Sequence, residues 1–227
     1  MMLHIPQVLT PAELKHCRDV MLQSRWIEGQ STSGEQARKA KLNLQLPVES
    51  PEARELGEIV LRALGRNPEF NSAALPLRVL PPMFNRYDQG MNFGSHVDGA
   101  IRVMPGGGPR MRADVSSTLF LNDPENYDGG GLIIEGGFEE RPVRLPAGDM
   151  IVYPTQSLHR VETITRGSRL AAFFWTQSIV KNHAHRDLLY QLDKAIRQLR
   201  MRVDDADPAI LSLTNSYHNL LQEWAEL

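Results

Sequence analysis

One short motif in the chain has residue types and a spacing that suit metal binding. It lies in the stretch NFGSHVDGA at residues 92–100. His96 and Asp98 are separated by a single residue, so on a β-strand both side chains point to the same face. An imidazole and a carboxylate aimed at one point can share a metal ion. Because H-x-D is frequent by chance, the motif needs a third ligand from elsewhere in the chain.

A third ligand is available in DMIVYPTQSLHRVETITRGSRLAAFFW at residues 149–175. Residues 150–153 are typical of a buried strand, and His159 begins a further strand of alternating character. Two histidines and one carboxylate match the facial triad of non-haem Fe(II) oxygenases, which leaves coordination positions open for a co-substrate and dioxygen. A structural zinc site normally has four protein ligands, often cysteines, and a chain whose only cysteine is Cys17 cannot supply them.

Arg169 follows His159 by ten positions and adds a group that binds carboxylates. We predict a turn at residues 165–168, which places Arg169 on the neighbouring strand, within reach of the metal pocket. The residues around it are apolar, so an unpaired charge there would be costly. A 2-oxo acid that chelates iron at one end would offer this guanidinium a planar carboxylate at the other end. Taken alone, Arg169 is better explained by a structural ion pair; together with the ordered triad, the co-substrate interpretation is favoured.

Composition limits the class of protein. The chain has 227 residues, a formal net charge of −2 and 41% hydrophobic residues, which suits one domain with ample core. The near-neutral balance provides no basic field for nucleic acid or for an anionic membrane. No apolar run approaches the roughly 20 residues that span a bilayer. The lack of a signal-peptide pattern and the single cysteine lead us to expect a cytoplasmic protein.

Local signals divide the chain into three regions. Residues 1–76 are predicted to be a helical region packed on the core, with helices that begin at Pro11 and Pro51 after capping residues. Residues 77–180 contain short β-type runs separated by Gly, Pro, Asn and Asp, which favours a sandwich, barrel or jelly roll. Residues 181–227 are predicted to be a helical extension that packs on the core and also offers a surface for a homodimer.

Two long connections, residues 99–114 and 122–128, are predicted to be loops that face the substrate. The first carries Arg102, Arg110 and Arg112. These arginines would suit an acidic substrate, although solvated loop charges are the more common explanation.

The order H-x-D, then His, then Arg ten residues later resembles the iron(II)/2-oxoglutarate-dependent dioxygenases. A wider pattern is similar to the prolyl-4-hydroxylase-like branch of that family: Tyr87-x-x-Gly90-x-x-Phe93-x-x-His96-x-Asp98. Over its whole length, the chain resembles the bacterial PKHD-type hydroxylases, the iron-uptake-associated PiuC-like group. This wider resemblance includes DGGGLIIE at 128–135, LPAGDMIVYP at 145–154 and the C-terminal helical tail.

The resemblance implies a double-stranded β-helix (jelly roll) in which His96, Asp98 and His159 hold Fe(II). It also implies that Arg169 binds the distal carboxylate of 2-oxoglutarate and that Tyr87 hydrogen-bonds the co-substrate. Dioxygen would be the second co-substrate and L-ascorbate the reductant. The expected activity is hydroxylation of a small molecule, and the family link to iron uptake suggests a siderophore-related compound.

At two positions the chain differs from the prolyl-4-hydroxylase-like branch, and each difference limits which properties of the branch can be expected here. Phe93 stands where the branch often has tyrosine, so a hydrogen bond from that position is absent. Arg169 stands where many prolyl hydroxylases of the branch use lysine, which weakens any inference of a protein-proline substrate. The main alternative to an enzyme is a non-catalytic jelly-roll protein that binds a metal or a small ligand.

Overall fold

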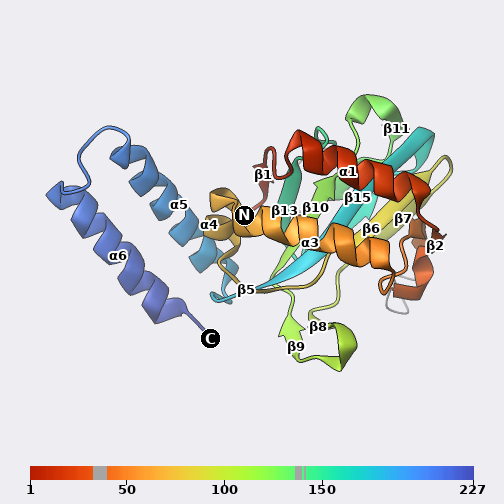
Figure 1. Cartoon of the computed structure of the whole chain (residues 1–227). Helices are drawn as coiled ribbons and strands as arrows, with labels where there is room; N and C mark the ends of the chain where they lie inside the picture. Colours follow the sequence, from red (N-terminus) through yellow and green to blue (C-terminus); the bar gives the residue numbers. More distant parts are fainter. Residues whose placement is uncertain (33–39, 136–139, 141) are drawn as a thin grey trace.

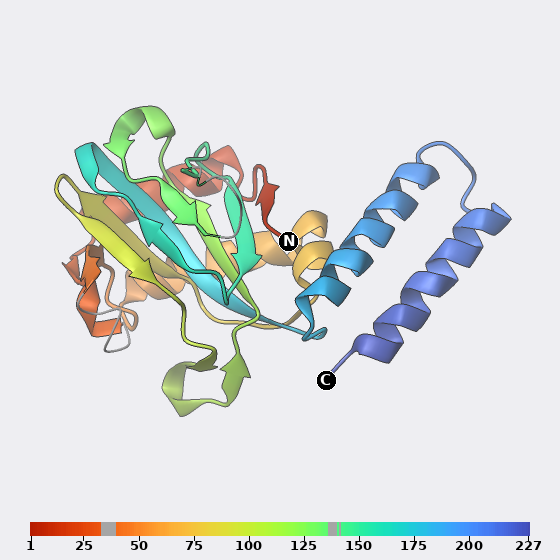
Figure 2. The same ribbon diagram turned by 180° about the vertical axis from the view of Figure 1, so that it is seen from behind.

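The core of the molecule is a pair of antiparallel β-sheets whose inner faces meet (Figures 1 and 2). The computed structural model describes residues 1–32, 40–135, 140 and 142–227. The larger sheet has the order β1-β13-β10-β15-β6-β4-β2, with β5 and β11 also paired to β15. Its strands are β1 (Leu3–Ile5), β2 (Ile27–Glu28), β4 (Leu44–Gln45), β5 (Pro76–Val79), β6 (Met83–Asp88), β10 (Val115–Phe120), β11 (Tyr127–Gly129), β13 (Met150–Pro154) and β15 (Ile164–Ser178).

The smaller sheet has the order β12-β14-β7-β3 and covers one face of the larger sheet. Its strands are β3 (Lys41–Leu42), β7 (Asn92–His96), β12 (Leu132–Ile134) and β14 (His159–Val161). A separate hairpin pairs β8 (Ile101–Val103) with β9 (Arg110–Arg112) and projects from the core (Figure 1). Short 3-10 turns complete the connections: η1 (Gly29–Thr32), η2 (Pro105–Gly107) and η3 (Pro124–Asn126).

Two helices cover the outer face of the larger sheet, α1 (Pro11–Gln23) and α3 (Pro51–Gly65) (Figure 1). The capping residues confirm the predicted starts. Thr10 and Glu13 form a reciprocal capping box on α1, and the Ser50 hydroxyl accepts the backbone N–H of Ala53 on α3. Each helix has proline at its first position, where no intrahelical N–H is needed. The short helix α4 (Pro68–Ala74) then leads into β5.

Both faces of the larger sheet are buried, and alternation along its strands separates two cores. On β13, Met150 and Val152 pack with the helices, whereas Ile151 and Tyr153 pack between the sheets. Since side chains alternate along a strand, each strand serves the helical layer with one set of residues and the inner cavity with the other. This arrangement explains why the β10 sequence VSSTLF is buried throughout. The fold is therefore the predicted double-stranded β-helix with flanking helices.

The turn predicted at residues 165–168 is wrong. Only residues 162–163 separate β14 from β15, and β15 continues without a break through the glycine at 167. Gly167 has a φ of +71°, and a Cβ built there would lie 2.2 Å from the carbonyl oxygen of Asn126. A glycine inside a strand often marks such a close backbone approach. Arg169 consequently lies in the larger sheet, facing β14 across the sandwich, and not on the strand beside it.

Two further expectations need correction. The connection 99–114 is not an open loop, because residues 101–103 and 110–112 pair as the β8–β9 hairpin. The region 1–76 is not only helical: β1 to β4 add to both sheets, with β1 on β13, β4 on β6 and β3 on β7. The N-terminal region thus completes the edges of the β core as well as covering it.

The C-terminal helices α5 (His183–Arg200) and α6 (Pro208–Trp224) form a helical hairpin at one end of the core (Figures 1 and 2). Arg186 fixes its base by donating to the backbone carbonyls of Val180 (2.7 Å) and Lys181 (2.8 Å). The end of α6 returns to the same point, where the Glu226 N–H donates to the carbonyl of Ile179. Among the described residues, no helix is both long and apolar enough to cross a bilayer.

Burial of the only cysteine allows a test of the helix-covered core. Cys17 is completely buried on α1, and burial raises the pKa of its thiol to about 11, with a further contribution from Glu13 and Glu55. Because only the thiolate reacts, we expect 5,5′-dithiobis(2-nitrobenzoate) to label native protein at least a hundredfold more slowly than protein in 6 M guanidinium chloride (~10²). Cys17→Ser provides the baseline. Rapid labelling of the native protein would contradict this packing.

Candidate active site

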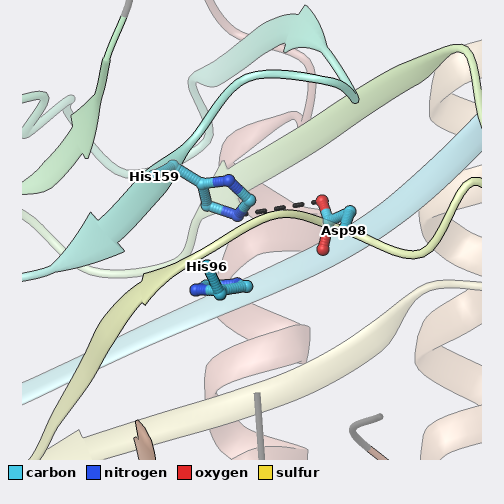
Figure 3. A group of neighbouring side chains, drawn as sticks. All are labelled: His96, Asp98 and His159. Carbon is cyan, nitrogen blue, oxygen red and sulfur yellow. Dashed lines mark ion pairs between the residues drawn. The ribbon is translucent and has the colours of Figure 1, made fainter. Parts of the chain in front are cut away.

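His96 and His159 are brought together by the pairing of β7 with β14. The two residues are directly opposite each other in the antiparallel register, and their ring centroids are 4.2 Å apart. Asp98 lies two residues beyond the end of β7 and turns toward them (Figure 3). Its Oδ2 is 3.7 Å from His159 Nε2, and one ligand atom from each of the three residues lies within 4.8 Å of the others. The predicted triad is therefore assembled in space.

Both imidazoles are oriented by the backbone. The Nδ1 of His96 lies 2.8 Å from the carbonyl oxygen of Gly94, and the Nδ1 of His159 lies 3.0 Å from that of Ser157. A carbonyl can only accept, so each Nδ1 carries the proton and each Nε2 keeps a lone pair for a metal. Burial, reinforced by His159, lowers the pKa of His96 to about 4, which keeps that imidazole neutral at pH 7.

Asp98 is oriented by a serine that sequence analysis did not identify. The Ser116 hydroxyl on β10 donates to Asp98 Oδ2 at 2.8 Å, and the Thr155 hydroxyl lies 3.1 Å from the same Ser116 oxygen. A hydrogen bond of this kind fixes the direction in which a ligating carboxylate points. Ser116 lies in a strand whose residues are all buried, so no alternation of exposed and buried positions singles it out.

A β-bulge on β7 adds an aromatic wall. Between Phe93 and His96 the strand contains one more residue than its partner β14. Residues three apart on a regular strand would face opposite sides, but a bulge shifts the alternation by one. Phe93 therefore stacks on the His96 ring at 3.6 Å between centroids and 16° between planes. The phenyl ring shields one face of this candidate ligand.

Arg169 and Tyr87 lie together on the inner face of the larger sheet. They are direct partners in the pairing of β15 with β6, and the guanidinium carbon lies 5.5 Å from the Tyr87 ring centroid and 5.1 Å from that of Phe120. Arg169 is only 1% exposed. Within the described parts of the chain, its Nε has no hydrogen-bond partner and no carboxylate forms an ion pair with it. A buried guanidinium in this state is complementary to an anion that enters from the cavity.

Tyr87 can act as a hydrogen-bond donor toward such an anion. Burial raises the pKa of its phenol to about 12, in spite of the nearby positive charge of Arg169. The group therefore stays protonated at neutral pH. Its O–H can donate to a carboxylate held by Arg169.

A single cavity of about 530 Å³ joins the triad to Arg169 and Tyr87 and extends outward. Its outer wall includes Arg102, from the segment predicted to face the substrate, and four residues that sequence analysis did not assign to the site: Lys41, Phe93, Phe173 and Trp175. Two of them could have been found, because Phe173 and Trp175 share the face of β15 with Arg169 by simple alternation. Lys41 comes from β3, which precedes the catalytic motifs and carries no pattern of its own. Burial lowers the pKa of Lys41 to about 8, with a further contribution from the positive charge of Arg102.

Two protein-family models match this chain. A model described as the 2OG-Fe(II) oxygenase superfamily matches residues 82–177, and one described as the PKHD-type hydroxylase C-terminal domain matches residues 184–226. The first range contains the triad, Tyr87 and Arg169. The second range covers most of α5 and α6.

Individual relatives that match over the full chain are PKHD-type hydroxylases. A PKHD-type hydroxylase of Methylobacterium nodulans is 61% identical over 227 residues, and one of Gluconobacter oxydans is 60% identical over 227 residues; both alignments cover 100% of each chain. A Pseudomonas putida prolyl-4-hydroxylase has a similar fold, with a TM-score of 0.52 and 17% identity over 78% of this chain and 92% of that chain. At this low identity, the solved structure supports the fold alone.

The role of Ser116 can be separated from general packing by a neighbouring serine. We expect Ser116→Ala to weaken Fe(II) binding about tenfold, because Asp98 loses the hydrogen bond that orients it. The measurement is a Co(II) or anaerobic Fe(II) titration of the metal-free protein. Ser117→Ala is the matched control, since Ser117 lies on the same strand beside Val152 and Phe174 of the helix-side core, and its hydroxyl has no hydrogen-bond partner within the described chain. Equal metal affinity in the two variants would show that Ser116 does not orient Asp98.

Proposed function

Because the chain belongs to the PKHD-type hydroxylases of the 2OG-Fe(II) oxygenase superfamily, we propose that His96, Asp98 and His159 hold its iron and that Arg169 and Tyr87 hold its 2-oxoglutarate. The observation that carries the proposal is the state of Arg169. A buried guanidinium that lacks an ion-pair partner within the described chain needs an anion, and it lies in the same cavity as the triad. Two histidines and a carboxylate on one side, with no cysteine among them, form a donor set that suits Fe(II).

The protein contributes position, charge and exclusion of water. The Nε2 atoms of His96 and His159 and one carboxylate oxygen of Asp98 would occupy one side of the metal and leave the cavity side open. Arg169 would hold the distal carboxylate of 2-oxoglutarate in a planar fork, with the Tyr87 phenol donating to it. When bound, iron and 2-oxoglutarate use dioxygen to hydroxylate a substrate, with release of succinate and carbon dioxide. The buried walls keep bulk water from the reacting atoms.

We further propose that L-ascorbate acts as reductant and that the substrate is a small molecule. A siderophore-related compound linked to iron uptake stays a prediction that rests on the family resemblance alone. The alternative of a non-catalytic metal-binding or ligand-binding protein is disfavoured, because the relatives that match over the full chain are hydroxylases.

The cofactor assignment can be tested without knowledge of the substrate. We expect anaerobic Fe(II) and 2-oxoglutarate to give a metal-to-ligand absorption band with wild-type protein. His159→Ala should abolish the band. Arg169→Gln should keep Fe(II) binding but raise the 2-oxoglutarate concentration needed by at least tenfold, because a charge-assisted bidentate contact is lost (~1.5–3 kcal/mol). Succinate formation with ascorbate is the second measurement. Absence of the band in wild-type protein would contradict the assignment.

A homodimer through the C-terminal helices is a separate part of the proposal. The helical hairpin stands beside the core (Figure 2). Leu188 of α5 and Leu211 of α6 are more than half exposed, at 54% and 57%. Exposed leucines on neighbouring helices are favourable contacts for a second copy.

Sedimentation velocity of the full chain tests this dimer. We expect a concentration-dependent dimer for wild-type protein, shifted at least tenfold toward monomer by Leu211→Glu, because a carboxylate would be buried at the contact. Leu22→Glu is the control, since Leu22 is an exposed leucine (73%) on α1, remote from the hairpin. A wild-type chain that is monomeric at all concentrations would exclude the dimer.

A further inference from the structure

We propose that Arg102 binds an acidic group of the substrate, and that the substrate is a small carboxylic acid whose apolar body lies against Phe173 and Trp175. This inference rests on the proposed function, because it places the acid in the same cavity beside the iron and 2-oxoglutarate. It goes further by assigning a substrate class and the residue that selects it.

Arg102 is presented to the cavity from the β8–β9 hairpin. Its guanidinium lies over the Trp175 ring, with the guanidinium carbon 3.6 Å from the ring centroid. A cation stacked in this way keeps its plane fixed and leaves its edge available for a planar acid. The cavity is lined by both residues and by the triad, so an acid held there would have its carbon skeleton near the metal.

The hydrogen-bonding capacity of Arg102 is not satisfied by the described residues. Its Nε is buried without a hydrogen-bond partner among them. Its Nη2 lies 3.7 Å from Asp98 Oδ1, which is too long for a hydrogen bond. Asp98 is, moreover, the carboxylate that would be used by the metal. Once Asp98 is committed to iron, the guanidinium requires another anion.

The net charge of the cavity also favours an anionic substrate. Among the described residues that line it, Asp98 is the single carboxylate, while Arg102 and Arg169 are both cationic. Fe(II) and the dianion of 2-oxoglutarate neutralise each other, so their binding leaves an excess of one positive charge. An anionic substrate offsets it, whereas a neutral one does not.

Several residues of the outer cavity are apolar. Val97 and Ile101 line its mouth and are half exposed, at 52% and 58%. Phe173 packs edge-on against Trp175, at 5.7 Å between ring centroids and 88° between planes. A site with a few placed polar groups on aromatic and aliphatic walls is suited to an organic acid, and less suited to a highly hydrated polyanion.

The structure also distinguishes Arg102 from the other two arginines on this segment. Arg112 is bound to Asp114 at 2.7 Å and to Glu226 at 3.3 Å. Arg110 is exposed and does not line the cavity. Arg110 therefore provides a matched control, because it lies on the same hairpin and carries the same charge outside the site.

Paired carboxylates and amides test the proposal directly. Wild-type protein with saturating Fe(II) and 2-oxoglutarate is titrated under anaerobic conditions with hippurate, 3-phenylpropanoate and N-acetylphenylalanine, and with the primary amide of each. Perturbation of the metal-to-ligand absorption band and isothermal titration calorimetry report binding. We expect at least one acid to bind tenfold or more tightly than its amide. This preference should be lost in Arg102→Gln and retained in Arg110→Gln.

The remaining outcomes overturn the proposal in distinguishable ways. If no acid is preferred over its amide, or if the preference survives in Arg102→Gln, Arg102 does not select an acid. If Arg102→Gln instead weakens the Fe(II)–2-oxoglutarate band itself, Arg102 is a positioning residue for Asp98. If the wild-type protein shows no band, the proposed function has failed before Arg102 is tested.

Discussion

The pairing of β7 with β14 is the constraint on which the site depends. His96 and His159 are direct partners in that register, so the same backbone hydrogen bonds that join the strands also set the distance between the two imidazoles. A slip of one residue would turn one histidine to the opposite face and leave the triad incomplete. The bulge between Phe93 and His96 adds to this dependence, because it places an aromatic ring against a candidate ligand where regular alternation would have placed it outside. Ser116 and the backbone carbonyls then refine an arrangement that strand pairing has already determined.

The larger sheet has to bury both of its faces and still hold a charged side chain. It is buried on both faces, yet its inner face holds Arg169, whose burial is costly unless an anion accompanies it. Alternation resolves this conflict: the even-numbered residues of β15, such as Leu170 and Ala172, contribute to the helix-side core, while Arg169 and Trp175 face the cavity. The α1 and α3 layer stabilises the sheet from behind. The cavity side can therefore hold polar groups that contribute to binding at some cost in stability, as is common for functional sites.

Features decided by neighbouring residues could be predicted from the sequence. Features that depend on contacts between distant segments of the chain could not. Capping at Thr10 and Ser50 is decided within a few residues, and both helices begin where expected. The H-x-D motif, His159 and Arg169 could be found because their order and spacing match the pattern of the family they resemble. In contrast, the glycine at 167 favours a turn by composition, and only its close approach to the backbone of Asn126 keeps it within a strand. Lys41 and Ser116 reach the site through pairing with distant strands, and no local pattern marks such contacts.

Electrostatic interactions connect the metal site, the 2-oxoglutarate site and Arg102 within the cavity. Among the described residues of the protein alone, Asp98 is the one carboxylate near Arg102 and Arg169 has none, so positive charge is concentrated in a desolvated cavity. Iron would withdraw Asp98 from Arg102, and 2-oxoglutarate would neutralise Arg169; each ligand therefore alters the electrostatic environment that the next one meets. With iron and 2-oxoglutarate bound, Arg102 would be the arginine of the cavity with the least charge compensation. A substrate that brings a carboxylate would both satisfy this guanidinium and place its own skeleton at the reacting centre, so that recognition and positioning depend on the same contact.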